Sequence, residues 1–236
     1  MSNMVVRTNV MALNSHRSLK TVGASQSKSS ARLSSGYRVN SAADDAAGLA
    51  ISEKMRAQIR GLDQASTNAQ DAISLVQTAE GGMQEIDNML QRIRELVNKA
   101  ANDTLDGATD ADRQKVADEV EQLITEINSM ADRVEFNKKT LLAGSFDSTV
   151  TATGTLHFQI GANSSQSLTM YVDSMKVSDI STKMGTAGAN FDLSDVISTV
   201  ASGAATAISA FLDEMDFALD VVIKSRSKLG AAQNRL

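Results

Sequence analysis

The chain has 236 residues, enough for one or two domains, and a net charge of −5. It contains no Cys, Pro or Trp, which excludes a disulfide framework, a thiolate nucleophile and a Cys-ligated metal. Aromatic residues make up only 3% of the chain, too few for a large sheet-based core, and the absence of Pro fits long unbroken helices. No stretch of about 18 apolar residues is present, so no membrane insertion is expected.

The first 43 residues form a basic, Ser-rich arm. They carry six Lys or Arg residues and no acidic one, whereas the rest of the chain carries 17 basic and 28 acidic residues. This composition fits an organelle transit peptide, a nucleic-acid-binding arm or a segment that orders on assembly. The acidic remainder argues against nucleic acid as a partner. We therefore expect residues 1–43 to be disordered, or helical only on assembly.

A long helix is predicted over residues 44–101, with Asn40, Ser41 and Asp44 as N-cap candidates. An apolar seam in alternating steps of three and four residues runs along it: Leu62, Ala65, Ala69, Ala72, Val76, Ala79, Met83, Ile86, Leu90, Ile93 and Val97. An ideal helix drifts by about 20° per heptad from such a repeat, so a seam held in register must face other helices. Gly81 and Gly82 lie inside this helix and indicate either a bend or the close approach of a neighbour.

Two further helices repeat the seam. Residues 110–134 carry Val116, Val120, Leu123, Ile127, Met130 and Val134. Residues 194–236 carry Ile208, Phe211, Met215, Ala218, Val222, Ser225, Leu229, Ala232 and Leu236. The loop before the second helix is short, so the first two helices should be antiparallel. The third helix ends without a cap, and we expect the natural chain to continue beyond it.

The segment between the second and third helices changes character. Alternating runs at residues 149–153 and 156–160, a turn signal at 161–165 and a return run at 168–172 predict a β-hairpin region over about 140–172. The predicted fold is mostly α: a long antiparallel helical rod, formed as a three-helix coiled-coil-like bundle, with a small β-hairpin region.

No catalytic or cofactor motif appears in the sequence, so neither an enzyme nor a cofactor is expected. His16 and His157 lie far apart in the sequence and lack ligand partners. Asp44 and Asp45 would point about 100° apart on a helix, which disfavours a paired-acid site. The polar patch Leu90–Leu96 on the long helix is, by its residues alone, most simply a solvated face with local charge pairs.

Five segments of the sequence resemble bacterial flagellin: Leu33–Ser52, Ala69–Gly81, Leu90–Leu96, Glu135–Asn137 and Leu229–Leu236. Together they span the chain and are highly specific. The resemblance implies a secreted, extracellular subunit of the bacterial flagellum that assembles with other flagellin subunits and is exported by the flagellar type III apparatus. That implication replaces the transit-peptide interpretation. Residues 1–43 would be an inner-core arm and residues 44–236 the rod, without the family's variable outer domains.

The resemblance also implies a site. In the family, the matching patch is recognised by Toll-like receptor 5 and is buried between subunits in the filament. The residues implied for receptor binding and subunit stacking are Leu90, Gln91, Arg92, Arg94, Glu95, Leu96 and, on the second helix, Glu119.

The resemblance leaves one family partner in doubt and one alternative open. The family continues past Leu229–Leu236 with about one more helix, which the export chaperone grips, so binding of that chaperone is not expected of this chain. The alternative identity is a hook–filament junction protein, a related rod with the same helical core.

Overall fold

The structure is a computed structural model that describes residues 9–102, 111–147, 154–184, 197, 200 and 205–236. In chain order the elements are α1 (Val10–Ser35), α2 (Ala46–Ala100), α3 (Ala111–Arg133), β1 (Glu135–Phe136), β2 (Lys139–Thr140), β3 (Leu156–Gln159), β4 (Ser167–Met170), α4 (Val177–Met184) and α6 (Ala205–Gln233). Long helices with two small two-stranded sheets confirm the predicted fold class. The predicted run 149–153 and the predicted helix start near 194 lie outside the described residues.

The chain divides into two compact units, Met1–Gly61 and Leu62–Leu236. In the first unit, the Asn9 side chain caps α1 by accepting a hydrogen bond from the backbone N–H of Ala12 at 3.1 Å. Gly36 ends the helix with φ 72°, a left-handed conformation that glycine adopts without steric cost. No described residue of α1 is buried. The helix therefore has local caps but no tertiary core of its own.

The start of α2 is fixed by Asp45 rather than by Asp44. The Asp45 carboxylate accepts a hydrogen bond from the backbone N–H of Gly48 at 2.9 Å, which is the N-cap geometry. Asp44 instead forms ion pairs with Lys28 and Arg32 of α1. The two adjacent carboxylates thus have separate structural roles, one as a cap and one as a tie to α1.

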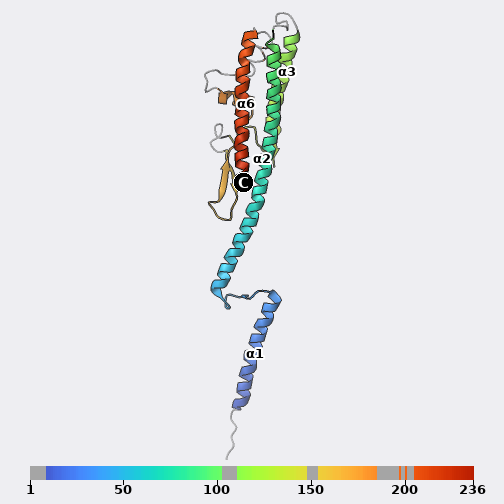
Figure 1. The fold of residues 1–236 in the computed structure, drawn as a ribbon. Helices are drawn as coiled ribbons and strands as arrows, with labels where there is room; N and C mark the ends of the chain where they lie inside the picture. The colour runs from blue at the N-terminus through green and yellow to red at the C-terminus, as the bar shows by residue number, and fades with distance from the viewer. Residues whose placement is uncertain (1–8, 103–110, 148–153, 185–196, 198–199, 201–204) are drawn as a thin grey trace, which may run out of the picture. The chain divides into compact units, whose positions relative to one another are not determined.

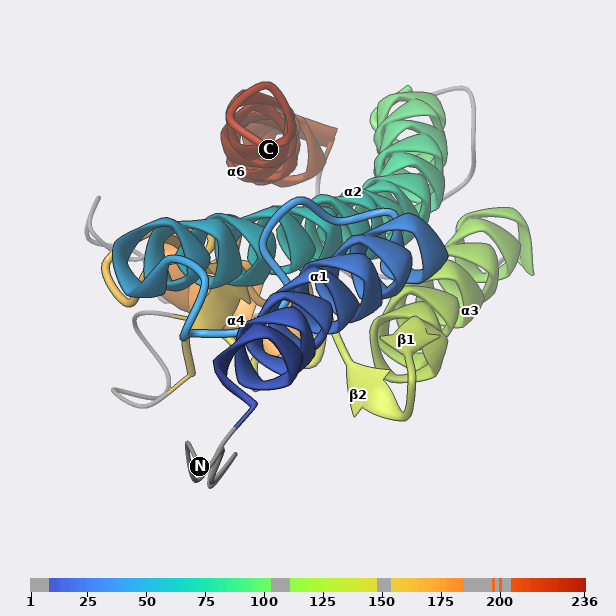
Figure 2. The same ribbon diagram turned by 90° about the horizontal axis from the view of Figure 1, so that it is seen from below.

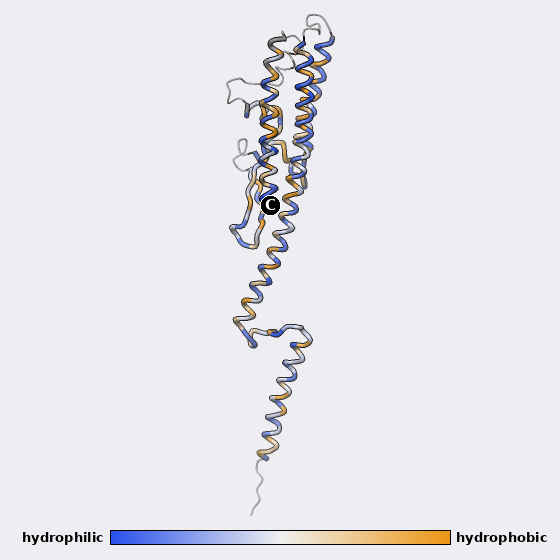
Figure 3. The backbone as a smooth tube through the Cα atoms, viewed as in Figure 1, coloured by the Kyte–Doolittle hydropathy of each residue, from blue (hydrophilic) through white to orange (hydrophobic). Residues whose placement is uncertain are grey.

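In the second unit α2 lies between α3 and α6, and both of these helices run antiparallel to it (Figures 1 and 2). Hydrophobic and hydrophilic residues alternate at short intervals along all three helices, as expected when each has one apolar face (Figure 3). The seam residues of α2 from Ala72 to Val97 are all at most 2% exposed. The prediction is wrong at the first member of the seam, because Leu62 is 49% exposed.

Gly82 lets another segment approach α2 closely. A Cβ atom at this position would lie 2.8 Å from Val134 Cγ2 and 3.0 Å from Leu142 Cδ1. At Gly81 an added Cβ would meet no atom within 4 Å. The close-approach interpretation therefore holds for Gly82, and α2 continues as a helix through both glycines.

The β1–β2 hairpin follows α3 directly and lies mostly outside the region predicted for strands. Its two turn residues, Asn137 and Lys138, have φ values of 50° and 63°. Two consecutive left-handed residues are the signature of a type I′ turn, whose twist matches that of the paired strands. Asn is favoured in such a turn, but Lys is not, so the sequence pattern did not point to it.

The second hairpin lies where the alternation predicts it. Leu156 pairs with Met170 and Phe158 with Leu168, so apolar side chains share one face of β3 and β4. Leu156, Leu168 and Met170 are buried, whereas His157 is exposed and lies 2.8 Å from the Thr155 hydroxyl.

A buried polar cluster ties the hairpin region to α4 and α6. Asp173 accepts hydrogen bonds from the Ser225 hydroxyl at 2.7 Å and from Lys228 Nζ at 2.8 Å. Lys183 of α4 forms ion pairs with the fully buried Asp147 at 2.6 Å and with Asp173 at 3.4 Å. Burial alone would raise the pKa of Asp173, but the Lys228 and Ser225 hydrogen bonds and the Lys183 charge hold that pKa below its usual value. The cluster is therefore built for a charged Asp173.

Alanine at Gly82 should destabilise the fold, whereas alanine at Gly81 should stabilise it. Gly82→Ala forces a methyl group against Val134 and Leu142, and overpacking of about 1–3 kcal/mol exceeds the roughly 1 kcal/mol gained in helix propensity. Gly81→Ala is the matched control, because it gains the same helix propensity and its added methyl group meets no atom within 4 Å. Urea denaturation of both variants measures the difference. A gain in stability for Gly82→Ala would contradict the close approach.

Asp173→Asn should lower the free energy of unfolding by about 1–3 kcal/mol at pH 7, because a buried charged hydrogen-bonded group loses its ion pairs. The pKa of Asp173 is lower in the folded state than its unfolded value of about 3.9. The stability that the ionised carboxylate contributes is therefore complete above the unfolded pKa and is lost as pH falls through the folded pKa. The gap between wild type and variant should therefore narrow below about pH 4. Asp220→Asn, which breaks an exposed pair with Lys224, is the control. Equal loss at pH 7 and pH 3 would refute the cluster's role.

Candidate functional site

The predicted patch on α2 divides by helical phase into an outward and an inward set. Gln91, Arg92, Arg94 and Glu95 are exposed. Leu90 and Leu96 are each only 2% exposed and belong to the core. These two leucines hold α2 against the bundle, so the surface available to a partner consists of the polar residues between them.

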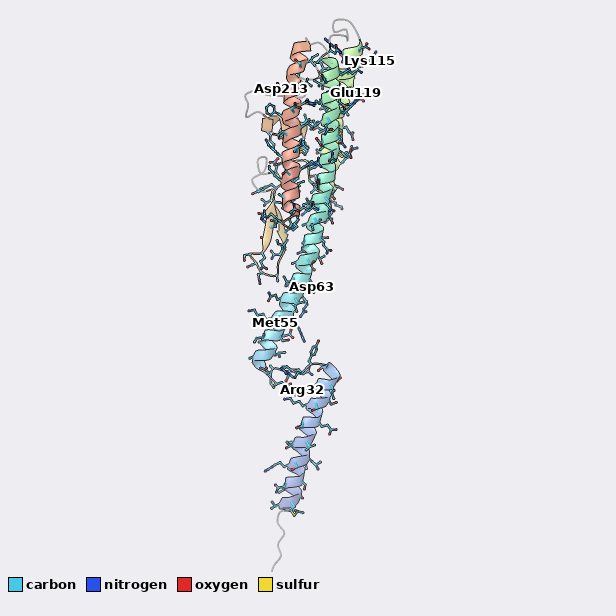
Figure 4. The ribbon with its side chains drawn as sticks, in the orientation of Figure 1. Arg32, Met55, Asp63, Lys115, Glu119 and Asp213 are labelled. Carbon is cyan, nitrogen blue, oxygen red and sulfur yellow. The ribbon has the colours of Figure 1, made fainter. Side chains whose placement is uncertain are left out.

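Arg92 joins this surface to α3. Its Nε and Nη2 atoms donate hydrogen bonds to Glu119 Oε1 at 3.1 and 2.8 Å, and its Nη1 atom donates to Glu95 Oε2 at 3.1 Å. Figure 4 labels Glu119 on α3. Hydrogen bonds from the guanidinium to Glu119 and then Glu95 raise the pKa of Arg92 above its ordinary value. The structure thus brings together three predicted residues that lie on two helices.

Arg94 faces the other neighbour, α6. Its Nε atom lies 2.7 Å from Asp216 Oδ1, and its Nη2 atom donates to Asp216 Oδ2 at 3.3 Å. Beside this pair is a surface hollow of about 460 Å³, and its lining residues are Gln91, Arg94, Glu95, Asn98, Asp216 and Leu219. Sequence analysis missed Asp216. It directly follows the seam residue Met215, but no pattern singles it out among the acidic residues of α6 as the one that reaches Arg94.

The surface is a polar, hydrogen-bonded face of the bundle. Hydrogen bonds hold its guanidinium and carboxylate groups in place, from Arg92 to Glu119 and from Arg94 to Asp216 between helices, and from Arg92 to Glu95 within α2. Among the described residues, no three His, Asp or Glu side chains are grouped as metal ligands would be. None of the described helices is both long and apolar enough to cross a membrane.

Comparison with known proteins identifies relatives over nearly the whole chain. The family model of the bacterial flagellin N-terminal helical region matches residues 6–147. The flagellin of Bacillus subtilis (strain 168) is 43% identical over 99% of this chain and 80% of its own length. The flagellar filament core protein flaB2 of Brachyspira hyodysenteriae is 41% identical over 99% of this chain and 78% of its own length. The crystal structure of Bacillus cereus flagellin superimposes with a TM-score of 0.51 at 25% identity, covering 71% of this chain and 82% of that one.

Proposed function

The chain belongs to the bacterial flagellin family, and we propose that its assembly into the filament covers an apolar stripe that the single subunit leaves exposed. As a flagellin it is a structural subunit of the extracellular flagellar filament, assembles with other flagellin subunits and is not an enzyme. The observation that carries the proposal is the exposure of Ile51, Met55 and Ile59 on α2, at 56%, 59% and 58%.

The stripe lies on the same helix as the buried seam, N-terminal to it. Ile51, Met55 and Ile59 are four residues apart, so they lie on one face of α2. The seam of the same helix is buried from Ala72 to Val97. Large apolar side chains exposed in a row mark interaction surfaces. α1 shows the same property, since Met11, Leu19 and Leu33 are 82%, 71% and 85% exposed.

We further propose the division into an inner arm, residues 1–43, and a rod, residues 44–236. An isolated helix without buried residues is marginally stable in water, which supports an arm that orders only in the filament. A chain without Cys has no disulfide to obstruct export in an unfolded state by the flagellar type III apparatus. Only residues 134–204 separate α3 from α6, which supports a short flagellin without variable outer domains.

The second part of the proposal concerns recognition by Toll-like receptor 5. Gln91, Arg92, Arg94, Glu95 and Glu119 form the contact surface, and Leu90 and Leu96 support it from the core. Its support is the pre-ordered network in which Arg92 bonds to two carboxylates. Subunit stacking uses the same surface, so stacking and receptor binding exclude each other. The relatives are flagellins and filament core proteins, so the junction-protein alternative is not carried forward.

Replacing the stripe should block assembly without unfolding the subunit. In the triple variant Ile51→Ser, Met55→Ser and Ile59→Ser the changed side chains are more than half exposed, so the melting temperature of the compact unit Leu62–Leu236 should not change. Sedimentation should show loss of filaments. Gln58→Ser, a polar exposed position on the same helix, is the control. Filaments from the triple variant equal to wild type would refute the role of the stripe.

Arg92→Ala and Glu119→Ala should each weaken receptor binding by about tenfold or more, because charged residues that are pre-ordered at an interface centre act as hot spots. Surface plasmon resonance against the receptor ectodomain measures the effect. Lys115→Ala, one turn away on α3 and paired with Asp112, serves as the control. If both variants bind as tightly as the control, the surface is not the receptor site.

A further inference from the structure

α6 carries an exposed aromatic side chain surrounded by carboxylates. Phe217 is 58% exposed, and a surface hollow of about 370 Å³ is lined by Phe217 together with Asp213, Asp216 and Asp220. Large exposed aromatic residues beside polar groups are the usual anchors of protein interfaces. Phe217 belongs neither to the proposed receptor surface nor to the stripe on α2.

The charges around Phe217 are only partly neutralised within the subunit. Asp216 is bound by Arg94 and Asp220 by Lys224. Asp213, labelled in Figure 4, forms no ion pair with any residue that the structure describes. The hollow therefore combines an apolar floor with net negative charge, and its complement is a segment that offers cations on aliphatic stems.

The β1–β2 turn offers such a complement. Lys138 and Lys139 are exposed and adjacent, and within the described part of the chain neither forms an ion pair. Neighbouring cations are engaged: Arg133 pairs with Glu126, and Lys176 with Asp132. The tight turn, with φ values of 50° and 63° at its centre, presents the lysines on a defined backbone rather than on a long loop.

We propose that the β1–β2 turn of one subunit docks into the Phe217 hollow on α6 of a neighbouring subunit. The inference rests on the proposed function, since it specifies one contact within filament assembly. The aliphatic stems of the lysines pack on the Phe217 ring, whose π-electrons also attract a nearby cation. The ammonium groups form ion pairs with the surrounding carboxylates, above all with Asp213.

The position of the two patches supports repeated docking. α6 and the β1–β2 hairpin lie on opposite sides of α2 (Figure 2). Two complementary patches on different faces of one subunit form a heterologous contact, which repeats from subunit to subunit into a ring or an open array and not into an isologous dimer. Each subunit can therefore use its turn toward one neighbour and its hollow toward another.

Charge reversal on each side, followed by their combination, tests the contact. The pair Lys138→Glu and Lys139→Glu, or the pair Asp213→Lys and Asp220→Lys, should each raise the critical subunit concentration for filament formation on the order of tenfold. The four changes together should restore it to near the wild-type value. Lys115→Glu, at an exposed position of α3 away from the turn, is the control, and thermal melting of each subunit checks its folding.

Cysteine cross-linking gives a second measurement, because the native chain contains no Cys. Filaments that mix Phe217→Cys and Lys138→Cys subunits should form disulfide-linked dimers on oxidation, and filaments that mix Phe217→Cys and Lys115→Cys subunits should not. Wild-type polymerisation itself tests the proposed function. If each charge-reversed pair polymerises like wild type and no cross-link exceeds that of the control, the docking contact is wrong. Filament assembly itself would not be contradicted by that result.

Discussion

The fold depends on one constraint: a straight apolar seam on α2 must be covered along its length. From Ala72 to Val97 the seam is buried in one apolar cluster with residues of α3, α6 and the segment between them. Charged residues of α2 that flank the seam also face α6. Glu80, Asp87 and Arg94 recur at seven-residue intervals, and each meets an opposite charge on α6. Apolar burial thus fixes the pairing of the helices, and the flanking charges fix its register.

The outward surface follows from the same arrangement. Leu90, Ile93 and Leu96 are drawn into the core, so the polar residues between them project outward. The two arginines then reach different helices, Arg92 to Glu119 of α3 and Arg94 to Asp216 of α6. Exposed ion pairs of this kind add little to stability, but they give the side chains partners on two different helices. The surface is therefore a consequence of bundle packing and needs no separate scaffold.

Periodicity in the sequence was sufficient to predict the three helices, their seams and the β3–β4 hairpin, because each depends on local spacing. It was insufficient where distant segments decide the outcome. Asp147 and Lys183 form a buried pair that no spacing connects, and the β1–β2 turn places Lys138 in a conformation that its residue type disfavours. For the site, the resemblance supplied Arg92 and Glu119, whereas Asp216, the partner of Arg94, is evident only in three dimensions.

α2 owes its order to the burial of its seam rather than to helix propensity. Amide hydrogen exchange along α2 in the isolated subunit tests it most directly. Amides of Ala72–Val97 should exchange orders of magnitude more slowly than those of Ile51–Leu62, and the amides of Ile51–Leu62 should gain protection in the filament. Uniform protection from Ile51 to Val97 in the isolated subunit would contradict it.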